Sequence, residues 1–394
     1  MMRVDEAIER LLQASHLRVE TERTGLENAV GRVLADDLVP PLDVPPADNS
    51  AMDGYAFRHV DWPGPDGELP LSQRITAGSV PGALSAASAA RIFTGAETPP
   101  GADTVVMQEH CEETAQGVRI LQRPAPGANI RRRGQDVRQG QVVLRRGHRL
   151  RPQDVGLAAS LGLAELPVYR RLKVATIATG DELAEPGEKA RPGQIYNSNR
   201  YLMHAQLSAW GFEVVDLGVA RDTFDAVEAV MRQAAASADF IVTSGGVSVG
   251  EEDHVKGVVA RLGALDLWKI AVKPGKPFAF GHVQGTPFIG LPGNPVSVFV
   301  TLLVIARGCL FASQGAADTR VRAVAGRAAF SRRETSREEY IRVRSTASGL
   351  ELYSNQSSGA LFSTCWSDGL VRQPSGMAIE EGDTVEYLPF QAFL

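Results

Sequence analysis

Short apolar runs alternate with amphipathic stretches between residues 172 and 310. Runs such as LKVATIA, DFIVTS and PFIG have the length of buried strands, and a polar loop containing glycine or proline follows each one. Apolar residues at helical spacing occur in the stretches 199–210, 223–236, 254–262 and 296–310. Strands and helices in this order predict a parallel sheet with helices on both faces.

The regions on both sides of this α/β segment have other patterns. Helical spacing predicts helices at 4–14, 26–35 and 150–161, whereas residues 55–143 hold short apolar runs between glycine and proline turns, as in a small β domain. After residue 320, the alternation in EEYIRVRSTASGLELYSNQ predicts a hairpin around its Ser-Gly turn, and DTVEYLPF predicts a final strand.

We therefore predict a multidomain protein of the α/β plus β class. A mixed N-terminal domain of helices and linkers is predicted at 1–45 and is completed by 140–169, with a small β domain inserted at 46–139. The parallel α/β domain follows at 170–315, and a C-terminal β domain at 316–394.

Composition and charge exclude several classes of protein. The net charge is -5, and Arg131-Arg132-Arg133 is the one run of three consecutive basic residues, long enough for a single anion but not for a nucleic acid. Three cysteines without zinc-ligand spacing favour a reduced, cytoplasmic setting. The longest apolar stretch, 296–306, is about half of a ~20-residue membrane span, so we predict a buried helix and no membrane partner.

Polar residues gather in the loops after the predicted strands. Ligands bind at the carboxyl ends of strands in open parallel sheets. Asp181 and Glu182 follow the first strand, where they could either coordinate Mg²⁺ or begin a helix near its positive end. Asp222 follows the second strand, and its place before Thr-Phe-Asp-Ala-Val favours a helix N-cap.

The loop SGGVSVGEEDH joins glycines, hydroxyls and acids. Its glycines let backbone N–H groups approach an anion closely, although it has neither the Walker A lysine nor the dinucleotide glycine pattern. The alternative is a turn before a capped helix. Its candidate binding residues are Ser244, Gly245, Gly246 and Ser248, with Glu251, Glu252 and Asp253 as carboxylates.

Three lysines surround the turn in WKIAVKPGKP. Lys269 and Lys273 are four residues apart, so on one strand they would share a face at a distance of roughly 13 Å. That spacing suits an elongated anionic ligand, and Lys276 lies beyond the turn. Solvated lysines at a sheet edge are the alternative.

The segment GLPGNPVS holds a rigid turn before a helix. Pro292 and Pro295 fix the turn, and the first N–H groups of the helix could bind an anion together with the hydroxyl of Ser297. A plain helix start is the alternative.

Weaker candidates lie in the N-terminal half, where a polar residue stands beside a glycine turn. They are Asp53 in NSAMDGYAF, Thr94 in RIFTGA, and Arg131 and Asp136 in NIRRRGQD. No HExxH pattern occurs, so a zinc protease is not predicted.

The motifs together resemble one known family. NSAMDGYA, FTGAETPPGADTVVMQE, NIRRRGQD, ATGDEL, GQIYNSN, TSGGVSVGEEDH, KPGKPFAFG and GLPGNPVS occur in this order, and the chain resembles the MoeA family from about residue 4 to 394. This family comprises the molybdopterin molybdenumtransferases and includes the E domain of gephyrin.

The resemblance implies an adenylyltransferase-like α/β domain and a β-barrel-like C-terminal domain. It implies an enzyme that inserts molybdenum from molybdate into adenylylated molybdopterin and releases AMP, with Mg²⁺ as the cation. It also implies a homodimer whose active site lies between the α/β domain of one subunit and the N-terminal domains of the other.

The resemblance also implies roles for individual residues. The metal ligands are Glu182, Asp222 and Asp253. The catalytic positions are Asp53, Thr94, Arg131, Asp136, Lys269 and Lys273. The substrate-binding positions are Ser244, Gly245, Gly246, Ser248, Lys276, Pro292, Pro295, Ser297 and Arg337. Of these, Lys273, Lys276, Ser297 and Arg337 are expected near molybdate.

Two other functions remain open from the sequence. The pathway's adenylyltransferase has a similar α/β domain, but it is shorter and lacks the MDGY and RRRG regions; it is also a possible partner of this chain. A receptor-anchoring scaffold, as in gephyrin, accompanies a fused adenylyltransferase domain that 394 residues do not accommodate. The sequence leaves molybdenum and tungsten as alternative metals.

Overall fold

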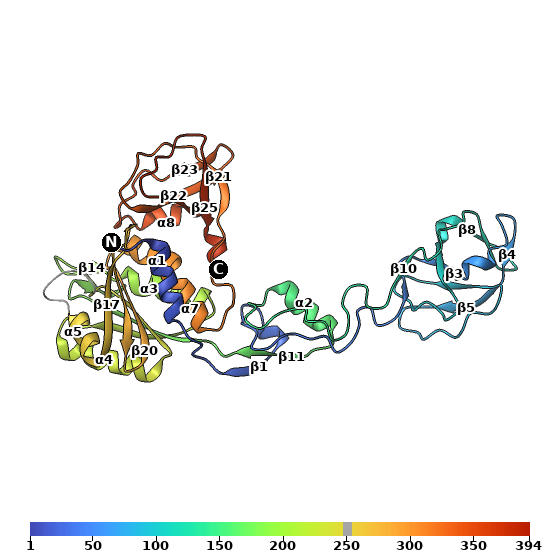
Figure 1. The fold of residues 1–394 in the computed structure, drawn as a ribbon, viewed down its shortest axis with the longest axis horizontal. Helices are drawn as coiled ribbons and strands as arrows, with labels where there is room; N and C mark the ends of the chain where they lie inside the picture. Colours follow the sequence, from blue (N-terminus) through green and yellow to red (C-terminus); the bar gives the residue numbers. More distant parts are fainter. Residues whose placement is uncertain (247–253) are drawn as a thin grey trace. The chain divides into compact units, whose positions relative to one another are not determined.

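The protein is described from a computed structural model, which covers residues 1–246 and 254–394. The chain forms two compact units, and Figure 1 labels many of their elements. Unit 1 comprises Met1–Asp36, Arg146–Arg151 and Glu165–Leu394, and unit 2 comprises Asp37–Arg145 and Pro152–Ala164. The division into four domains that the sequence indicates remains a prediction.

A six-stranded sheet forms the centre of unit 1, with the strand order β15-β12-β16-β20-β19-β17. Its first four strands are parallel: β15 (Glu213–Ala220), β12 (Lys173–Thr179), β16 (Phe240–Ser244) and β20 (Thr286–Leu291). The other two, β19 (Pro277–Val283) and β17 (Gly263–Lys269), are joined by antiparallel pairing. The sheet is therefore mixed. The strand pattern did not predict β19, since Gly281 and His282 interrupt its apolar run.

Alternating side chains of this sheet contribute to two cores. Ala175 and Ile241 belong to a core with residues of α4 (Phe224–Ser237) and α5 (His254–Leu262). Val174 and Val242 belong to a second core, with residues of α1 (Val4–Ala14), α3 (Ser198–Ala209) and the helix at 295–313. Figure 1 shows α4 and α5 on one side of the sheet and α1, α3 and α7 on the other. The predicted helices on both faces are confirmed.

The apolar helix spans Pro295–Ser313 and consists of α6 (Pro295–Thr301), a π-helical turn (Leu302–Ala306) and α7 (Arg307–Ser313). It is long and apolar enough to cross a membrane, but 78% of its most apolar window is buried inside the protein. It is therefore a core helix, as its sequence predicted.

One predicted helix is wrong. Residues 26–35 contain only a 3-10 turn at Leu26–Asn28. Beyond that turn, Val33 forms a β-bridge with Arg149, and Leu34 forms one with Val168. Tertiary pairing of these apolar residues therefore overrides their helical spacing.

The C-terminal part of unit 1 is a curled sheet with the order β18-β22-β24-β25-β21 and with β23 on β22. A bridge between Ala328 and Leu350 links the end of β21 to β23, so the sheet nearly closes, as expected for a barrel-like domain. The hairpin and the final strand are confirmed, while the short helix α8 (Phe362–Trp366) was not predicted. The strands are β18 (Val272–Lys273), β21 (Val324–Arg327), β22 (Glu338–Thr346), β23 (Gly349–Leu352), β24 (Gly369–Gln373) and β25 (Thr384–Pro389).

Unit 2 is built from small sheets and the helix α2 (Pro152–Ser160). One sheet has the order β5-β6-β3-β7, a second β4-β9-β8, and a third pairs β10 with β2. The strands are β2 (Asn49–Ser50), β3 (Gly54–Phe57), β4 (Glu68–Leu69), β5 (Leu71–Ile75), β6 (Ala89–Ile92), β7 (Thr104–Met107), β8 (Cys111–Glu113), β9 (Val118–Ile120) and β10 (Ile130–Arg131). In unit 1, β1 (Thr21–Gly25) pairs with β11 (Glu165–Tyr169), and β13 (Leu183–Ala184) with β14 (Ile195–Tyr196).

Candidate functional site

Loops after three neighbouring parallel strands pack together along the edge of the central sheet that the carboxyl ends of these strands form. They begin at Gly180 after β12, Gly245 after β16 and Pro292 after β20. The N–H of Gly245 donates to the carbonyl oxygen of Leu291 at 3.2 Å, and a Cβ on Gly245 would lie 3.0 Å from the carbonyl oxygen of Thr179. Because Gly245 has a φ of 85°, glycine fits this close approach without strain.

Three carboxylates stand in the loops after β12 and β15. Glu182 folds back over Gly180, where a Cβ would collide with its carboxylate. The backbone N–H of Asp222 donates to Oδ1 of Asp181 at 3.2 Å, and this bond holds the two loops together. The residues are exposed or half-buried, so their oxygens remain accessible to a hard cation.

Asp222 is not the helix cap that its sequence context favoured. The N-cap of α4 is Thr223, whose Oγ1 accepts a hydrogen bond from the N–H of Ala226 at 3.4 Å. The helix begins one residue later than expected, because threonine supplies the capping oxygen. Asp222 therefore lies one residue before the cap.

Lys269 and Lys273 do not share a strand, so the predicted spacing on one face is wrong. β17 ends at Lys269, and Lys273 belongs to β18, which pairs with the C-terminal sheet. Backbone bonds explain the break: the N–H of Met2 donates to the carbonyl oxygen of Lys269, and the N–H of Ile270 donates to that of Lys276 at 3.0 Å. The lysines therefore surround a closed loop.

This lysine loop lies against the start of α6. Gly275, at the loop's turn, has a φ of 112°. A Cβ there would lie 3.7 Å from the carbonyl oxygen of Ser297 and 3.8 Å from Cγ of Pro292, and it would overlap the methyl group of Thr301. The structure thus brings the KPGKP and GLPGNPVS motifs together.

The start of α6 offers fewer free donors than its sequence suggested. Pro295 has no N–H, and the N–H of Val296 donates to the carbonyl oxygen of Ser358 at 3.0 Å. Ser297 is buried, and its carbonyl oxygen accepts from Oγ1 of Thr301 at 2.7 Å. An anion at this edge would therefore depend more on the lysine loop than on the helix start.

Lys273 contacts a carboxylate that the sequence analysis missed. Its Nζ lies 3.2 Å from each carboxylate oxygen of Glu339, and Nη2 of Arg332 lies 2.8 Å from Oε1 of the same group. Nearby, Nη1 of Arg337 donates to the carbonyl oxygen of Val272 at 3.1 Å. The sequence pattern could have indicated a buried carboxylate, since an alternating strand places Glu339 on one face with apolar Ile341 and Val343. A carboxylate on a buried face needs cationic partners.

In unit 2, Asp53 and Thr94 form one hydrogen-bonded pair. Oδ1 of Asp53 accepts from the N–H of Thr94 at 2.8 Å and from its hydroxyl at 2.7 Å. These two bonds, with a smaller contribution from the charge of Arg91, hold the pKa of the Asp53 carboxyl below its usual value. The two residues selected separately from the sequence therefore act together.

Salt bridges occupy most of the arginine run of unit 2. Arg132 pairs with Asp48 at 2.6 Å, and Arg133 pairs with Asp43 at 2.6 Å. Arg131 is exposed on β10 and makes no salt bridge within residues 1–246 and 254–394, and Asp136 is also exposed. Of the three arginines at 131–133, which were expected to bind an anion together, only Arg131 therefore remains a candidate.

Four predicted site residues, Ser248, Glu251, Glu252 and Asp253, lie outside the described residues. Within residues 1–246 and 254–394, no group of three or more His, Cys, Asp or Glu side chains is arranged to hold a metal ion. The carboxylates of Asp181, Glu182 and Asp222 thus supply at most part of a metal site.

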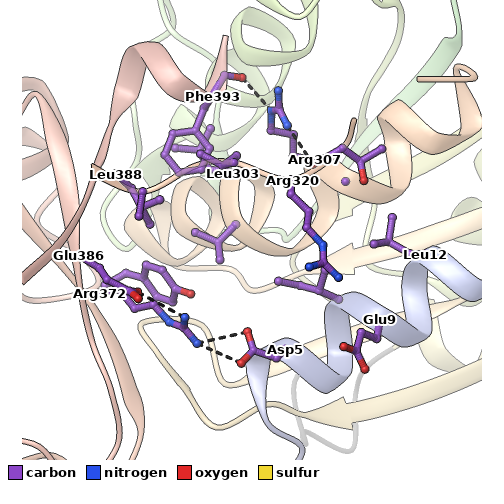
Figure 2. A pocket seen from close by; sticks show the side chains of 17 residues that line it. Asp5, Glu9, Leu12, Leu303, Arg307, Arg320, Arg372, Glu386, Leu388 and Phe393 are labelled. Carbon is purple, nitrogen blue, oxygen red and sulfur yellow. Dashed lines mark hydrogen bonds and ion pairs between the residues drawn. The ribbon is translucent and has the colours of Figure 1, made fainter. Parts of the chain in front are cut away.

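A cavity of about 550 Å³ lies elsewhere in unit 1, between α1, the 295–313 helix and strands of the C-terminal sheet (Figure 2). Arg372 contacts Asp5 at 3.1 Å on its wall, and burial lowers the pKa of Arg307 to about 10. None of the residues predicted to bind substrate lines this cavity. It is therefore separate from the loops at the sheet edge.

Family models match most of the chain. "MoeA N-terminal region (domain I and II)" matches residues 2–162, "Probable molybdopterin binding domain" matches 175–311, and "MoeA C-terminal region (domain IV)" matches 325–390.

Individual relatives agree with these matches. The chain is 42% identical over 326 residues to the molybdopterin molybdenumtransferase of Haemophilus influenzae, which covers 80% of this chain and 78% of that protein. It is 42% identical over 304 residues to molybdopterin molybdenumtransferase 2 of Mycobacterium tuberculosis, covering 74% and 75%. A crystal structure of the MoeA protein of Pyrococcus horikoshii has 29% identity and a TM-score of 0.87, and covers 99% of this chain and 100% of that one.

Proposed function

The chain belongs to the MoeA family, and we propose that it is a molybdopterin molybdenumtransferase that inserts molybdenum from molybdate into adenylylated molybdopterin and releases AMP. It acts in the biosynthesis of molybdenum cofactor. The adenylylated form of the substrate and the release of AMP come from the family resemblance.

The cationic cluster beside the lysine loop is the observation that carries this proposal. Lys273, Arg332 and Arg337 contribute three positive charges, and Glu339 one negative charge, which leaves a net charge of +2. Lys276 of the same loop adds a further positive charge, so the cluster has the excess of positive charge that a dianion such as molybdate requires. Gly275 places the same loop against Pro292 and Ser297, beside the edge where the other candidate loops meet. The proposed molybdate subsite is therefore Lys273, Lys276, Ser297 and Arg337.

The carboxylates at the sheet edge support a divalent cation in the site. The hydrogen bond between the loops of Asp181 and Asp222 brings two acids to one place, and carboxylate oxygens suit Mg²⁺. We propose Glu182, Asp222 and Asp253 as its principal ligands. When bound, the cation would compensate phosphate charge as AMP leaves. Glycines of the TSGG loop and Lys269 would hold the remaining anionic groups of the substrate.

The N-terminal residues have a place in the same reaction. We propose a cytoplasmic homodimer in which the second subunit supplies Asp53, Thr94, Arg131 and Asp136. The bonds from Thr94 keep Asp53 ionised and fix one of its oxygens, so the other oxygen is available to orient a substrate group or a cation-bound water. The pathway's adenylyltransferase, whose product this chain would consume, is a further partner in the proposal.

The test is to incubate the purified protein with adenylylated molybdopterin and Mg²⁺, with and without molybdate. We expect AMP release that depends on molybdate, together with a product that activates a cofactor-free molybdoenzyme. Tungstate in place of molybdate shows which metal the enzyme uses. ATP consumption with free molybdopterin would instead assign the chain to the adenylyltransferase step, and the absence of both reactions would contradict an enzymatic role.

A further inference from the structure

A strand of only two residues carries Lys273 into the C-terminal sheet. β18 pairs in parallel with β22, so that Val272 is opposite Glu338 and Lys273 is opposite Glu339. The pairing ties the lysine loop, which leaves the central sheet at Lys269, to a different sheet of unit 1. The position of Lys273 is therefore set by a residue 66 positions later in the chain.

The carboxylate of Glu339 lies beneath two cations. Its side chain is 1% exposed, whereas those of Lys273 and Arg332 are 41% and 26% exposed. Both cations contact the same oxygen, Oε1, and Lys273 also contacts Oε2. A buried anion thus holds an ammonium group and a guanidinium group side by side, each with donors left for another ligand.

We propose that Glu339 is a positioning residue for the molybdate subsite and that Arg332 is a further cation of that subsite. This inference rests on the proposed function. The carboxylate fixes the amino group of Lys273, and it brings in Arg332, a residue outside the motifs that pointed to the site. Without it, Lys273 would keep its charge but lose its fixed location, and the two like charges would separate.

The alternative is an ion pair that only joins two sheets. Burying a carboxylate requires partners wherever it occurs, so the contacts alone do not distinguish these roles. The preceding residue provides a matched comparison. Glu338 is also an ion-paired carboxylate of β22, 13% exposed, but its partner is Arg372 at 3.0 Å, and no contact joins it to Lys273 in the described part of the chain.

The experiment compares Glu339→Gln with Glu338→Gln in the full-length protein, using AMP release at varied molybdate and at varied adenylylated molybdopterin. Loss of a fixed charged hydrogen bond predicts that Glu339→Gln raises the KM for molybdate about tenfold or more. We expect the KM for adenylylated molybdopterin to change less than about twofold, and Glu338→Gln to leave both values near those of the wild type. In a background of Lys273→Met, which lacks AMP release, molybdate binding is measured instead, and adding Glu339→Gln should raise the Kd for molybdate by less than about threefold, because the carboxylate then positions only Arg332.

Equal molybdate KM values for Glu339→Gln and the wild type would overturn the inference, as would equal effects of both glutamine variants. If Glu339→Gln does not fold, the variant Arg332→Gln is measured instead, because it leaves the carboxylate of Glu339 paired with Lys273. That variant should raise the molybdate KM several-fold, and an unchanged value would count against the inference. A wild-type protein without molybdate-dependent AMP release contradicts the proposed function itself and would be recognised before any variant is measured.

Discussion

Replacing Gly275 by alanine tests whether the lysine loop requires glycine at its turn. The φ of 112° is rarely adopted by residues with a Cβ, and enforcing such a conformation costs about 1–3 kcal/mol. The new Cβ would also approach Cγ2 of Thr301 closer than 3.0 Å, which real Cβ contacts avoid. Overpacking of this kind costs about 1–3 kcal/mol more. The total of about 2–6 kcal/mol is a large part of the ~5–15 kcal/mol that stabilises a typical domain.

The assay is urea denaturation, combined with hydrogen exchange of peptides that cover residues 270–301. Gly293→Ala is the matched control, because that glycine belongs to the neighbouring loop, has no positive φ, and has no atom of the described part of the chain within 4 Å of a new Cβ. Thr301→Ser removes the clashing methyl group but keeps the hydroxyl that donates to Ser297, so Gly275→Ala should cost about 1–3 kcal/mol less in this background. If Gly275→Ala were as stable as Gly293→Ala, our account of this loop would be refuted.

Four further predictions concern individual residues of the proposed site and one helix cap. Mixing Asp53→Asn with Lys273→Met subunits should restore part of the AMP release that each variant lacks, because one of the two sites of a mixed dimer would contain both wild-type residues. No recovery of AMP release in confirmed mixed dimers would count against a shared site. Asp253→Asn should abolish Mg²⁺-dependent AMP release, and unchanged release would remove Asp253 from the metal ligands. Thr94→Val should raise the pKa of Asp53 in an NMR titration, since the hydroxyl bond is lost while the bond from the backbone N–H remains. The pKa of Asp53 is lower in the folded than in the unfolded state, so the stabilisation that Asp53 gives is present above its unfolded pKa and is lost as pH falls through the folded pKa. The free energy of unfolding of this variant should therefore differ least from that of the wild type at acid pH. A pKa of Asp53 that does not rise would contradict the role given to the Thr94 hydroxyl. Asn197→Ala should destabilise unit 1 by about 1 kcal/mol, because the side chain of Asn197 caps α3 by accepting a hydrogen bond from the N–H of Arg200. Asn294→Ala should cost less, since the side chain of Asn294 makes no capping bond at the start of α6 within the described residues. Equal urea midpoints of the two variants would refute the capping argument.

Local patterns in the sequence predicted most of the α/β region. Helical spacing located α3, α4, α5 and the buried helix at 295–313, and the apolar runs located four strands and the order of the loops. Periodicity failed where side chains alternate poorly, as at β19, and where tertiary pairing decided the outcome, as at Val33 and Leu34. Both failures reflect contacts that a local window does not contain.

The candidate site was predicted one motif at a time, and the structure added the contacts between motifs. The bond of Thr94 to Asp53 and the pairing of Lys273 with Glu339 join residues that are 41 and 66 positions apart. No spacing rule connects such residues, because the sheets that bring them together are themselves formed by long-range pairing. Glu339 could have been noticed as an acid on an apolar strand face, but its partners could not.

The ratio of AMP released to molybdenum incorporated, measured in a single turnover, decides whether the protein couples the two reactions. The wild-type protein with adenylylated molybdopterin, Mg²⁺ and molybdate should give one molybdenum in the pterin product for each AMP, and Lys273→Met should give neither at the same molybdate concentration. AMP release from the wild type without molybdenum in the product would contradict the account.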